Sequence, residues 1–336
     1  MSTRRSFSSH LAPVFARYLA LKQALGRQYA VERDVLAHLD RFLAAQPVAR
    51  SDLTPETFTQ WCATLAHLTP GVRRKRMRIV RNLCLYRQRT EPGCFVPDPN
   101  LFPRPHAPLR PHFFTEQEFI QLLDVTEGLQ PTSNSPLRAE VYRLALVLLY
   151  TAGLRRGELV RLILADYEPQ ERTLHIRATK FHKSRLVPLS RDGAREMDLY
   201  LKARRSLPHT PDTPLLCNRN GGLRPYTGAG LGQGLRHLFR CTGVRTFSGQ
   251  TPRVHDMRHS FAHNALLRWY RAGVDVQTKL PSLATYMGHV SIISTQHYLT
   301  FMEPVAQSAS DLFAHHCASL LDGARRKEAH DEDRLS

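Results

Sequence analysis

The sequence predicts a mainly α-helical protein with a small antiparallel β-sheet, divided into two domains. Apolar residues recur three and four positions apart over most of the chain, which indicates helices, whereas strand-like alternation is confined to 173–187. The 336 residues are 42% hydrophobic and 23% charged, which suffices for two buried cores. We predict a helical domain at 1–95, a Pro-rich linker at 96–112 and a second domain with a polar tail at 113–336.

The first domain consists of several short helices between Leu11 and Arg89. Leu36, Leu39 and Leu43 illustrate the helical spacing. In LTPETF, Pro55 stands at a first helical position, so a helix is expected to begin near there.

The last helix of this domain is strongly basic. Eight basic residues and no acidic ones lie between residues 73 and 89. Met77, Val80 and Cys84 share one face, so the helix can pack and still present a cationic stripe. Contact with nucleic acid would supply the missing counter-charge, and a solvated charged face is the alternative. The candidate DNA-binding residues are Arg73, Arg74, Arg76, Arg78 and Arg81.

The domain boundary is marked by proline. Seven prolines between residues 91 and 111 suppress helix and favour an extended connector. A new helix is then predicted at FTEQEFIQLLDV, because Thr115 and Glu118 form a capping-box pattern.

The second domain alternates helices with one short β-region. The apolar helix VYRLALVLLY is expected to end at Gly153. Residues Thr173–Val187 predict a β-hairpin or a three-stranded sheet with a turn near Phe181–Lys183. Helical patterning returns from Val254 onward.

The charge of the chain indicates a polyanionic partner. Lys and Arg number 47 against 29 Asp and Glu, which gives a net charge of +18. The longest apolar stretch, Leu144–Leu149, is far too short for a membrane span, and the N-terminus lacks the apolar region of a signal peptide. Six scattered cysteines form no CxxC pair. We therefore expect double-stranded DNA as the partner, no membrane, and a cytoplasmic, nucleoid-associated protein.

Four separated segments follow one another in a distinctive order. They are TAGLRRGE at 151–158, TKFHKSRLVPL at 179–189, HDMRH at 255–259 and MGHVSIISTQHY at 287–298. This order resembles the tyrosine recombinase (phage integrase) family over residues 114–305. The resemblance implies a helical N-terminal core-binding domain and an α+β catalytic domain.

Arginine suits the chemistry that this resemblance implies. Transfer of a phosphodiester without a metal requires cationic donors for the phosphate oxygens, and the planar guanidinium binds two oxygens at once. The resemblance assigns Arg155 and Arg258 as the two catalytic arginines, with Arg156 expected to face solvent. Glu158 matches the acidic member of the family site, although a plain surface pair with Arg155 is the alternative.

Proton transfer is assigned by the same resemblance. Lys180 would be the general acid that protonates the departing 5′ oxygen, with Lys183 as a competing assignment. His255 would accept and return the proton of the tyrosine, sharing a helix face with Arg258. His289 would donate a hydrogen bond to the scissile phosphate.

Tyr298 matches the nucleophile of the family, nine residues after His289. A phenol has a pKa of about 10, so it needs a base and cationic neighbours to attack phosphorus at neutral pH. Most tyrosines are packing residues, and Tyr286 is the nearest rival for the role.

Three histidines at four-residue intervals offer a competing interpretation. His255, His259 and His263 could bind zinc from one helix face, but the glutamate of the HExxH pattern is missing and no further ligand is evident. We therefore predict no metal and treat His259 as a supporting neighbour of the site. The interval from Arg258 to His289 is longer than the family usually shows, with the surplus around 269–281.

The predicted function is site-specific DNA recombination through a 3′-phosphotyrosyl intermediate, with no cofactor. The resemblance further implies a homotetramer on two DNA sites, in which the segment QSASDLFAHHCASLL could dock on a neighbouring subunit. Accessory recombinase subunits are unknown. The alternatives are a nicking-closing enzyme like a type IB topoisomerase and a catalytically silent DNA-binding protein.

Overall fold

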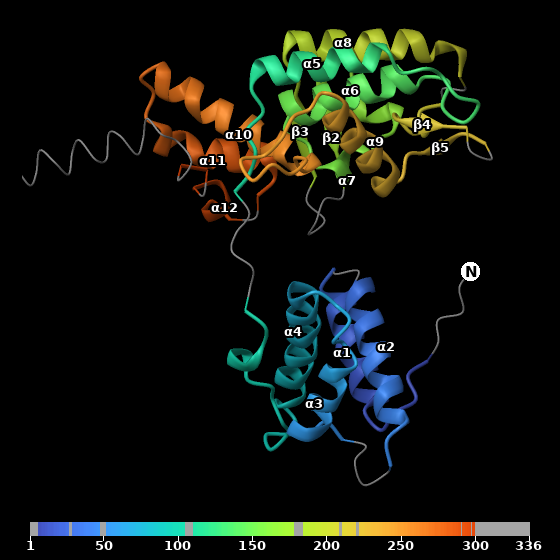
Figure 1. Cartoon of the computed structure of the whole chain (residues 1–336), viewed down its shortest axis with the longest axis vertical. Coiled ribbons are helices and arrows are strands. Elements are labelled where there is room, and N and C mark those ends of the chain that lie inside the picture. Colours follow the sequence, from blue (N-terminus) through green and yellow to red (C-terminus); the bar gives the residue numbers. More distant parts are fainter. Residues whose placement is uncertain are drawn as a thin grey trace, which may run out of the picture. The chain divides into compact units, whose positions relative to one another are not determined.

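The chain divides into two compact units, which span Met1–Arg110 and Pro111–Ser336 (Figure 1). The computed structural model describes residues 6–26, 29–47, 52–104, 110–177, 184–207, 210–219, 222–289, 291–296 and 298–299. No helix in these ranges is long and apolar enough to cross a membrane.

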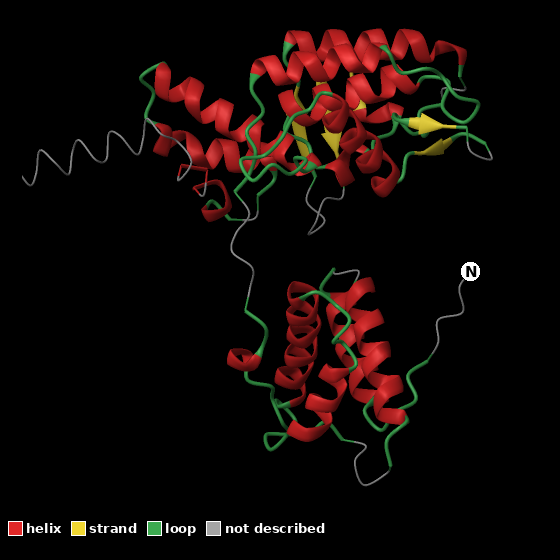
Figure 2. Ribbon diagram, in the orientation of Figure 1, coloured by secondary structure: helices red, strands yellow, loops and turns green. Residues whose placement is uncertain are grey.

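In its described part the first unit consists of helices and loops without a strand (Figure 2). Its helices are α1 (Ala12–Ala24), α2 (Ala30–Ala44), α3 (Pro55–Ala63) and α4 (Pro70–Arg87). As predicted, Pro55 opens α3, and the side chain of Thr54 caps it by accepting a hydrogen bond from the Thr57 N–H at 3.2 Å. Trp61 is fully buried in the core of this unit.

Part of the predicted linker belongs to the first unit. Phe102 is 4% exposed in the helical core, and Phe95 and Val96 pack against the same cluster. The division between the units falls after Arg110, so the extended segment is shorter than the proline content suggests. Large apolar side chains between the prolines account for this, because their burial holds the segment against the helices.

Helix α6 (Arg138–Thr151) is the centre of the second unit. It is buried along most of its length and packs against α5 (Glu116–Glu127), α8 (Arg191–Ala203), α9 (Gly228–Cys241) and α10 (Val254–Arg271). The predicted capping box of α5 is present, since Thr115 accepts from the Glu118 N–H and the Glu118 carboxylate accepts from the Thr115 N–H.

The predicted β-region is a three-stranded antiparallel sheet. Strand β2 (Thr173–Ile176) lies between β1 (Tyr167–Glu168) and β3 (Arg185–Pro188), and Leu174 pairs with Val187. A separate two-stranded sheet joins β4 (Cys217–Asn218) to β5 (Arg224–Pro225). The predicted turn near Phe181 lies outside the described residues.

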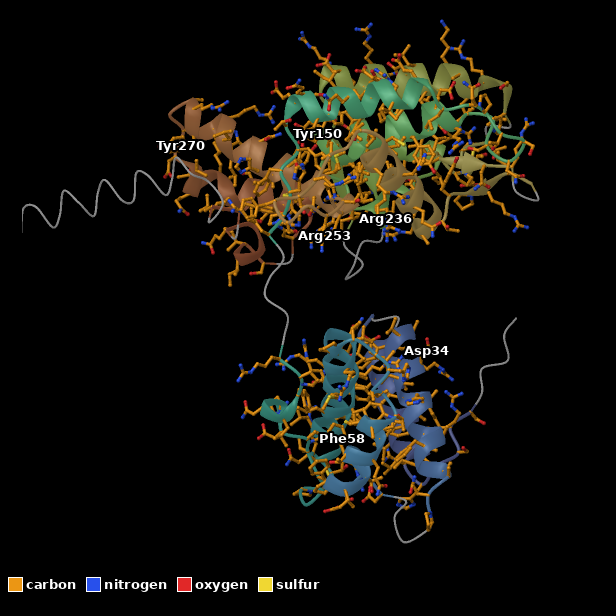
Figure 3. The ribbon with its side chains drawn as sticks, viewed as in Figure 1. Asp34, Phe58, Tyr150, Arg236, Arg253 and Tyr270 are labelled. Atoms are coloured by element: carbon orange, nitrogen blue, oxygen red, sulfur yellow. The ribbon has the colours of Figure 1, made fainter. Side chains whose placement is uncertain are left out.

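The last described helices form a smaller core beside α6. Helix α10 packs against α11 (Val276–Met287), which is followed by the short α12 (Ile293–Gln296). Arg253 and Tyr270 mark the two ends of α10 in Figure 3, and the Asn264 amide of α10 donates to the Tyr150 hydroxyl of α6 at 3.0 Å. The surplus noted in the sequence at 269–281 therefore comprises the end of α10, the turn that follows it and the start of α11.

Candidate active site

Arg155 is held at a sharp turn between two helices. Gly153 ends α6 with φ of +59°, and Arg155 precedes the short helix α7 (Arg156–Leu159). Glycine is needed here for two reasons. The positive φ is strained for other residues, and a Cβ at position 153 would lie 2.4 Å from the ring of Phe261. Arg156 is exposed, as predicted, and its guanidinium lies against Gly232 of α9.

Glu158 is a buried carboxylate between two guanidinium groups. Its side chain is only 2% exposed, and its Oε1 accepts from Arg155 Nη1 at 2.7 Å. Arg185 donates to both carboxylate oxygens, at 3.1 and 2.8 Å. Burial alone raises the pKa of Glu158, but the hydrogen bonds and charges of Arg185 and Arg155 outweigh it and lower the pKa to about 2. The plain surface pair considered from the sequence is therefore wrong.

Arg185 was not predicted as a site residue. Its side chain is 10% exposed, and its Nε donates to the Tyr286 carbonyl at 2.8 Å in addition to its contacts with Glu158. It thus joins strand β3 to the end of α11 and to α7. The segment SRLVPL carried a signal, because a lone basic residue follows the two lysines of the hairpin at the start of a strand.

Arg258 is the most deeply buried cation of the cluster. It projects from α10, is 1% exposed, and donates to the carbonyls of Gly153 at 2.5 Å and Met287 at 2.6 Å. Burial and the neighbouring Arg155 lower its pKa to about 9, so it remains protonated at neutral pH. Two of its five N–H groups are used in these contacts, and three remain.

The Gly288–His289 pair ends α11 beside the arginines. Gly288 adopts φ of +66°, and its carbonyl accepts from Arg155 Nη2 at 2.9 Å. A Cβ here would approach Arg185 Nη1 to 2.8 Å. His289 Nδ1 lies 2.7 Å from the Thr295 hydroxyl. Burial, with the charges of Arg258 and Arg155, lowers the pKa of His289 to about 4, so the ring is neutral at pH 7.

Tyr298 lies in the same cluster and is 3% exposed. Its hydroxyl is 3.0 Å from Nδ1 of His259, and its ring stacks with that of His289 at 6.4 Å between centroids. Burial raises the pKa of Tyr298, while the positive charges of Arg258 and Arg155 partly offset this rise. The rival Tyr286 donates its hydroxyl to the Pro188 carbonyl at 3.1 Å.

The three histidines of α10 occupy different surroundings. His255 is exposed, and its ring meets that of His259 edge-on at 4.7 Å, whereas His263 stacks on Phe113 at 4.4 Å. Within the described ranges, no group of three His, Cys, Asp or Glu side chains could hold a metal ion.

Two predicted features fall outside the described residues. Lys180 and its competitor Lys183 lie within 178–183, and the proposed docking segment QSASDLFAHHCASLL lies beyond Leu299. The structure therefore brings together Arg155, Glu158, Arg258, His259, His289 and Tyr298, with His255 at the edge of the group.

Comparisons with known proteins identify the family of the chain. Residues 112–303 match the phage integrase family. The integrase/recombinase y4rB of Sinorhizobium fredii is 32% identical over 84% of this chain and 90% of its own length. The chain belongs to the phage integrase family of tyrosine recombinases. Tyrosine recombinase XerA of Pyrococcus horikoshii is 30% identical over 56% of each chain.

Solved structures of tyrosine recombinases share the fold. The Tn1549 transposon integrase, in complex with a circular intermediate DNA, gives a TM-score of 0.63 at 17% identity and covers 91% of this chain and 100% of its own. XerH bound to palindromic difH substrate gives a TM-score of 0.60 at 16% identity, covering 83% of this chain and 78% of its own. At these identities the likeness concerns the fold of the recombinase alone.

The basic helix α4 of the recombinase presents fewer exposed cations than its sequence suggests. Arg78 is exposed, but Arg74 donates to the Pro103 carbonyl at 2.8 Å and Arg81 to the Pro97 carbonyl at 3.0 Å. Arg73 and Arg76 are half-buried, and the charge of Arg76 contributes to lowering the pKa of His38, after burial. The predicted continuous stripe is therefore partly occupied by the segment that follows the helix.

Glu158→Gln is expected to destabilise the recombinase in a pH-dependent way. The pKa of Glu158 is about 2 in the folded protein against 4.5 for the free side chain, so its contribution is present above pH 4.5 and is lost as the pH falls toward 2. The expected loss of unfolding free energy at pH 7 is about 3 kcal/mol. Urea unfolding between pH 7 and pH 3 measures it, and the difference from wild type should shrink only below about pH 4.5.

Glu127→Gln is the matched control for this measurement. Its carboxylate is 72% exposed and pairs with Arg143 at 3.3 Å, so its replacement should change stability by less than about 1 kcal/mol. Equal losses of unfolding free energy for the two variants would contradict the stabilising role of the buried Glu158 carboxylate.

Proposed function

We propose that Tyr298 is the nucleophile with which this tyrosine recombinase cleaves one DNA strand. The phenolic oxygen attacks the scissile phosphorus, a 3′-phosphotyrosyl bond forms, and the 5′ oxygen leaves as a hydroxyl. A 5′ hydroxyl from another strand then reverses the reaction and completes the exchange. The observation that carries this proposal is the buried Tyr298 hydroxyl, which lies within the electrostatic influence of both Arg155 and Arg258.

The two arginines are proposed to bind the phosphate during the reaction. Each is anchored by backbone carbonyls, Arg155 to Gly288 and Arg258 to Gly153 and Met287, so their remaining N–H groups are fixed before DNA arrives. Such preorganised donors stabilise the charge that develops on the phosphate oxygens. Glu158 balances only part of the guanidinium charge, which leaves the cluster suited to an anion.

Three further side chains complete the proposed chemistry. With the Thr295 hydroxyl donating to Nδ1, the neutral ring of His289 carries its proton on Nε2 and can donate it to a phosphate oxygen. Lys180 is proposed from the family pattern as the acid that protonates the departing 5′ oxygen. We further propose that His255, which is exposed at the start of α10, contacts the phosphate.

Double-stranded DNA is the proposed partner, and four protomers are proposed to assemble on two DNA sites. The net charge of +18 supports a polyanionic partner. The Tn1549 integrase and XerH, which share the fold, were both solved with DNA. A cytoplasmic, nucleoid-associated location follows from this partner.

A nicked suicide duplex carrying the target site tests the reaction. Loss of the short fragment beyond the nick prevents religation, so the covalent adduct accumulates and Tyr298 can be identified by peptide mass analysis. Absence of an adduct under conditions of proven specific binding would indicate a DNA-binding protein only. Mixing two differently labelled duplexes then separates recombination from topoisomerase-like nicking and closing, which yields relaxed DNA but no recombinant.

Neutralising Arg78, an exposed cation of α4, is expected to weaken DNA binding uniformly across sequences. Arg78→Gln should reduce the slope of log affinity against log salt by about 0.9 for a lost phosphate contact. Arg74→Gln and Arg81→Gln should reduce it less, because their guanidinium groups already bond to backbone carbonyls. Affinities measured at four salt concentrations give the slopes. An unchanged slope for Arg78→Gln would assign α4 to solvent instead of DNA.

A further inference from the structure

The hydroxyl of Tyr298 faces a histidine that the family pattern does not assign to proton transfer. The resemblance gave the proton of the tyrosine to His255. In the structure, Nδ1 of His259 lies 3.0 Å from the Tyr298 oxygen, and the two rings are 5.4 Å apart between centroids. His255 lies one helical turn earlier on α10 and is exposed, with its ring against that of His259.

We infer that His259 accepts the proton of Tyr298 during cleavage and returns it during religation. This inference rests on the proposed function of Tyr298 as nucleophile. As the phenolic oxygen bonds to phosphorus, its proton moves to Nδ1 of His259 and the bond from phosphorus to the 5′ oxygen breaks. The 5′ oxygen takes its proton from the general acid, proposed to be Lys180. In religation each proton returns to its origin, so no oxidant or further reactant is consumed.

The protonation state of His259 suits this role. Burial lowers the pKa of His259 to about 4, with further contributions from the neighbouring positive groups, so the ring is neutral at pH 7 and one nitrogen can accept. With its proton on Nε2, the ring presents the Nδ1 lone pair to the phenol. The charged or titratable groups around it are His255, Arg253, Asp256, Arg258 and Tyr298.

Bound DNA is expected to make His259 a stronger base. A phosphodiester brings a negative charge to Arg258, whose positive charge contributes to the lowered pKa of His259. Without DNA, burial raises the pKa of Tyr298, so the phenol stays protonated until it attacks phosphorus. Transfer of its proton to His259 is therefore coupled to the attack on phosphorus.

The different roles proposed for His255 and His259 follow from the exposure of their side chains. His255 stands at the exposed beginning of α10, where a phosphate can reach it, and His259 is half-buried against the nucleophile. The i, i+4 spacing places both on one helix face. In this arrangement His255 contacts the phosphate and His259 contacts the tyrosine.

His259→Gln tests the inference on the full-length protein with the nicked suicide duplex. The amide oxygen of glutamine can accept a hydrogen bond from the phenol but cannot take its proton. Adduct formation at saturating DNA should slow by at least about 10²-fold, with DNA affinity unchanged. The matched control is His263→Gln, one turn further along α10, where the ring stacks on Phe113 away from the cluster. It should cleave at the wild-type rate.

Replacing Tyr298 with a fluorinated tyrosine separates a base from a merely structural residue. Its phenol is more acidic and depends less on a base. Fluorotyrosine should therefore increase the rate of adduct formation by His259→Gln at least about tenfold more than it increases the wild-type rate. A substrate with a 5′-bridging sulfur, whose leaving group needs no proton, should not rescue this variant.

Three outcomes would overturn the inference. They are a near-normal rate for His259→Gln, rescue by the sulfur substrate instead of the fluorinated tyrosine, and fluorotyrosine rescue of His255→Gln but not of His259→Gln. His259→Ala with added imidazole provides a second variant, in which cleavage should recover with imidazole concentration. A wild-type protein that forms no adduct would instead refute the proposed function itself.

Discussion

Tyr298→Phe is expected to bind DNA as tightly as the wild-type recombinase and to form no covalent adduct. The substitution removes one oxygen atom and leaves the buried ring in place. The rate of adduct formation should fall by more than about 10³-fold, because a reaction that proceeds through a bond to this oxygen has no substitute nucleophile. Denaturing gels of the trapped complex measure the adduct, and mobility shifts measure binding.

Tyr286→Phe is the matched control for this experiment. Its hydroxyl donates to the Pro188 carbonyl, and its removal leaves the hydroxyl of Tyr298 untouched. Stability should fall by about 1 kcal/mol for the lost hydrogen bond, with cleavage nearly normal. If Tyr298→Phe still formed an adduct, the nucleophile would have to be sought elsewhere in the chain.

Arg155→Lys should damage cleavage nearly as much as Arg155→Ala. One amino group of Arg155 bonds to Glu158 and the other to the Gly288 carbonyl, so the planar group has a fixed orientation. An ammonium group is a point charge that cannot make both contacts and also bind two phosphate oxygens. We expect a loss of about 10²- to 10³-fold in the rate of single-turnover cleavage for either variant.

Arg156→Lys provides the comparison for that measurement. Its side chain is exposed beside Gly232 and lies outside the cluster. The same change of residue type should therefore leave the cleavage rate within about twofold of the wild-type rate. Near-normal cleavage by Arg155→Lys would show that charge alone suffices and would remove Arg155 from the role of a phosphate clamp.

Local signals in the sequence predicted the secondary structure well. The helix start near Pro55 and the capping box of Thr115 were predicted because these signals depend on residues within one turn of each other. Gly153 was identified as a helix end for the same local reason. Alternation on each side of a turn predicted the paired strands β2 and β3, whereas β1 precedes the predicted region.

Contacts between distant residues could not be predicted in this way. Arg185 reaches Tyr286 across 101 positions, and His259 meets Tyr298 across 39. The resemblance gave the proton of the tyrosine to His255, whereas the histidine next to the Tyr298 hydroxyl in the structure is His259. That choice depends on the rotation of α10 about its axis, which is set by the packing of Ala262, Leu266 and their partners in the core.

The same limit applies to the basic helix. Periodicity identified Met77, Val80 and Cys84 as its buried face, and all three are buried. It gave no indication that the carbonyls of Pro97 and Pro103 would accept from Arg81 and Arg74. Proline-rich segments provide carbonyls without matching N–H groups, which makes them good acceptors for arginine.

The anchoring of Arg155 by Gly288 has a consequence during protein synthesis. These residues are 133 positions apart, and Arg258 likewise depends on a carbonyl 105 positions before it and another 29 positions after it. Such long-range closure is slow and occurs late in folding. A chain still attached to the ribosome therefore lacks the finished arginine cluster until the segment that carries Gly288 has been released.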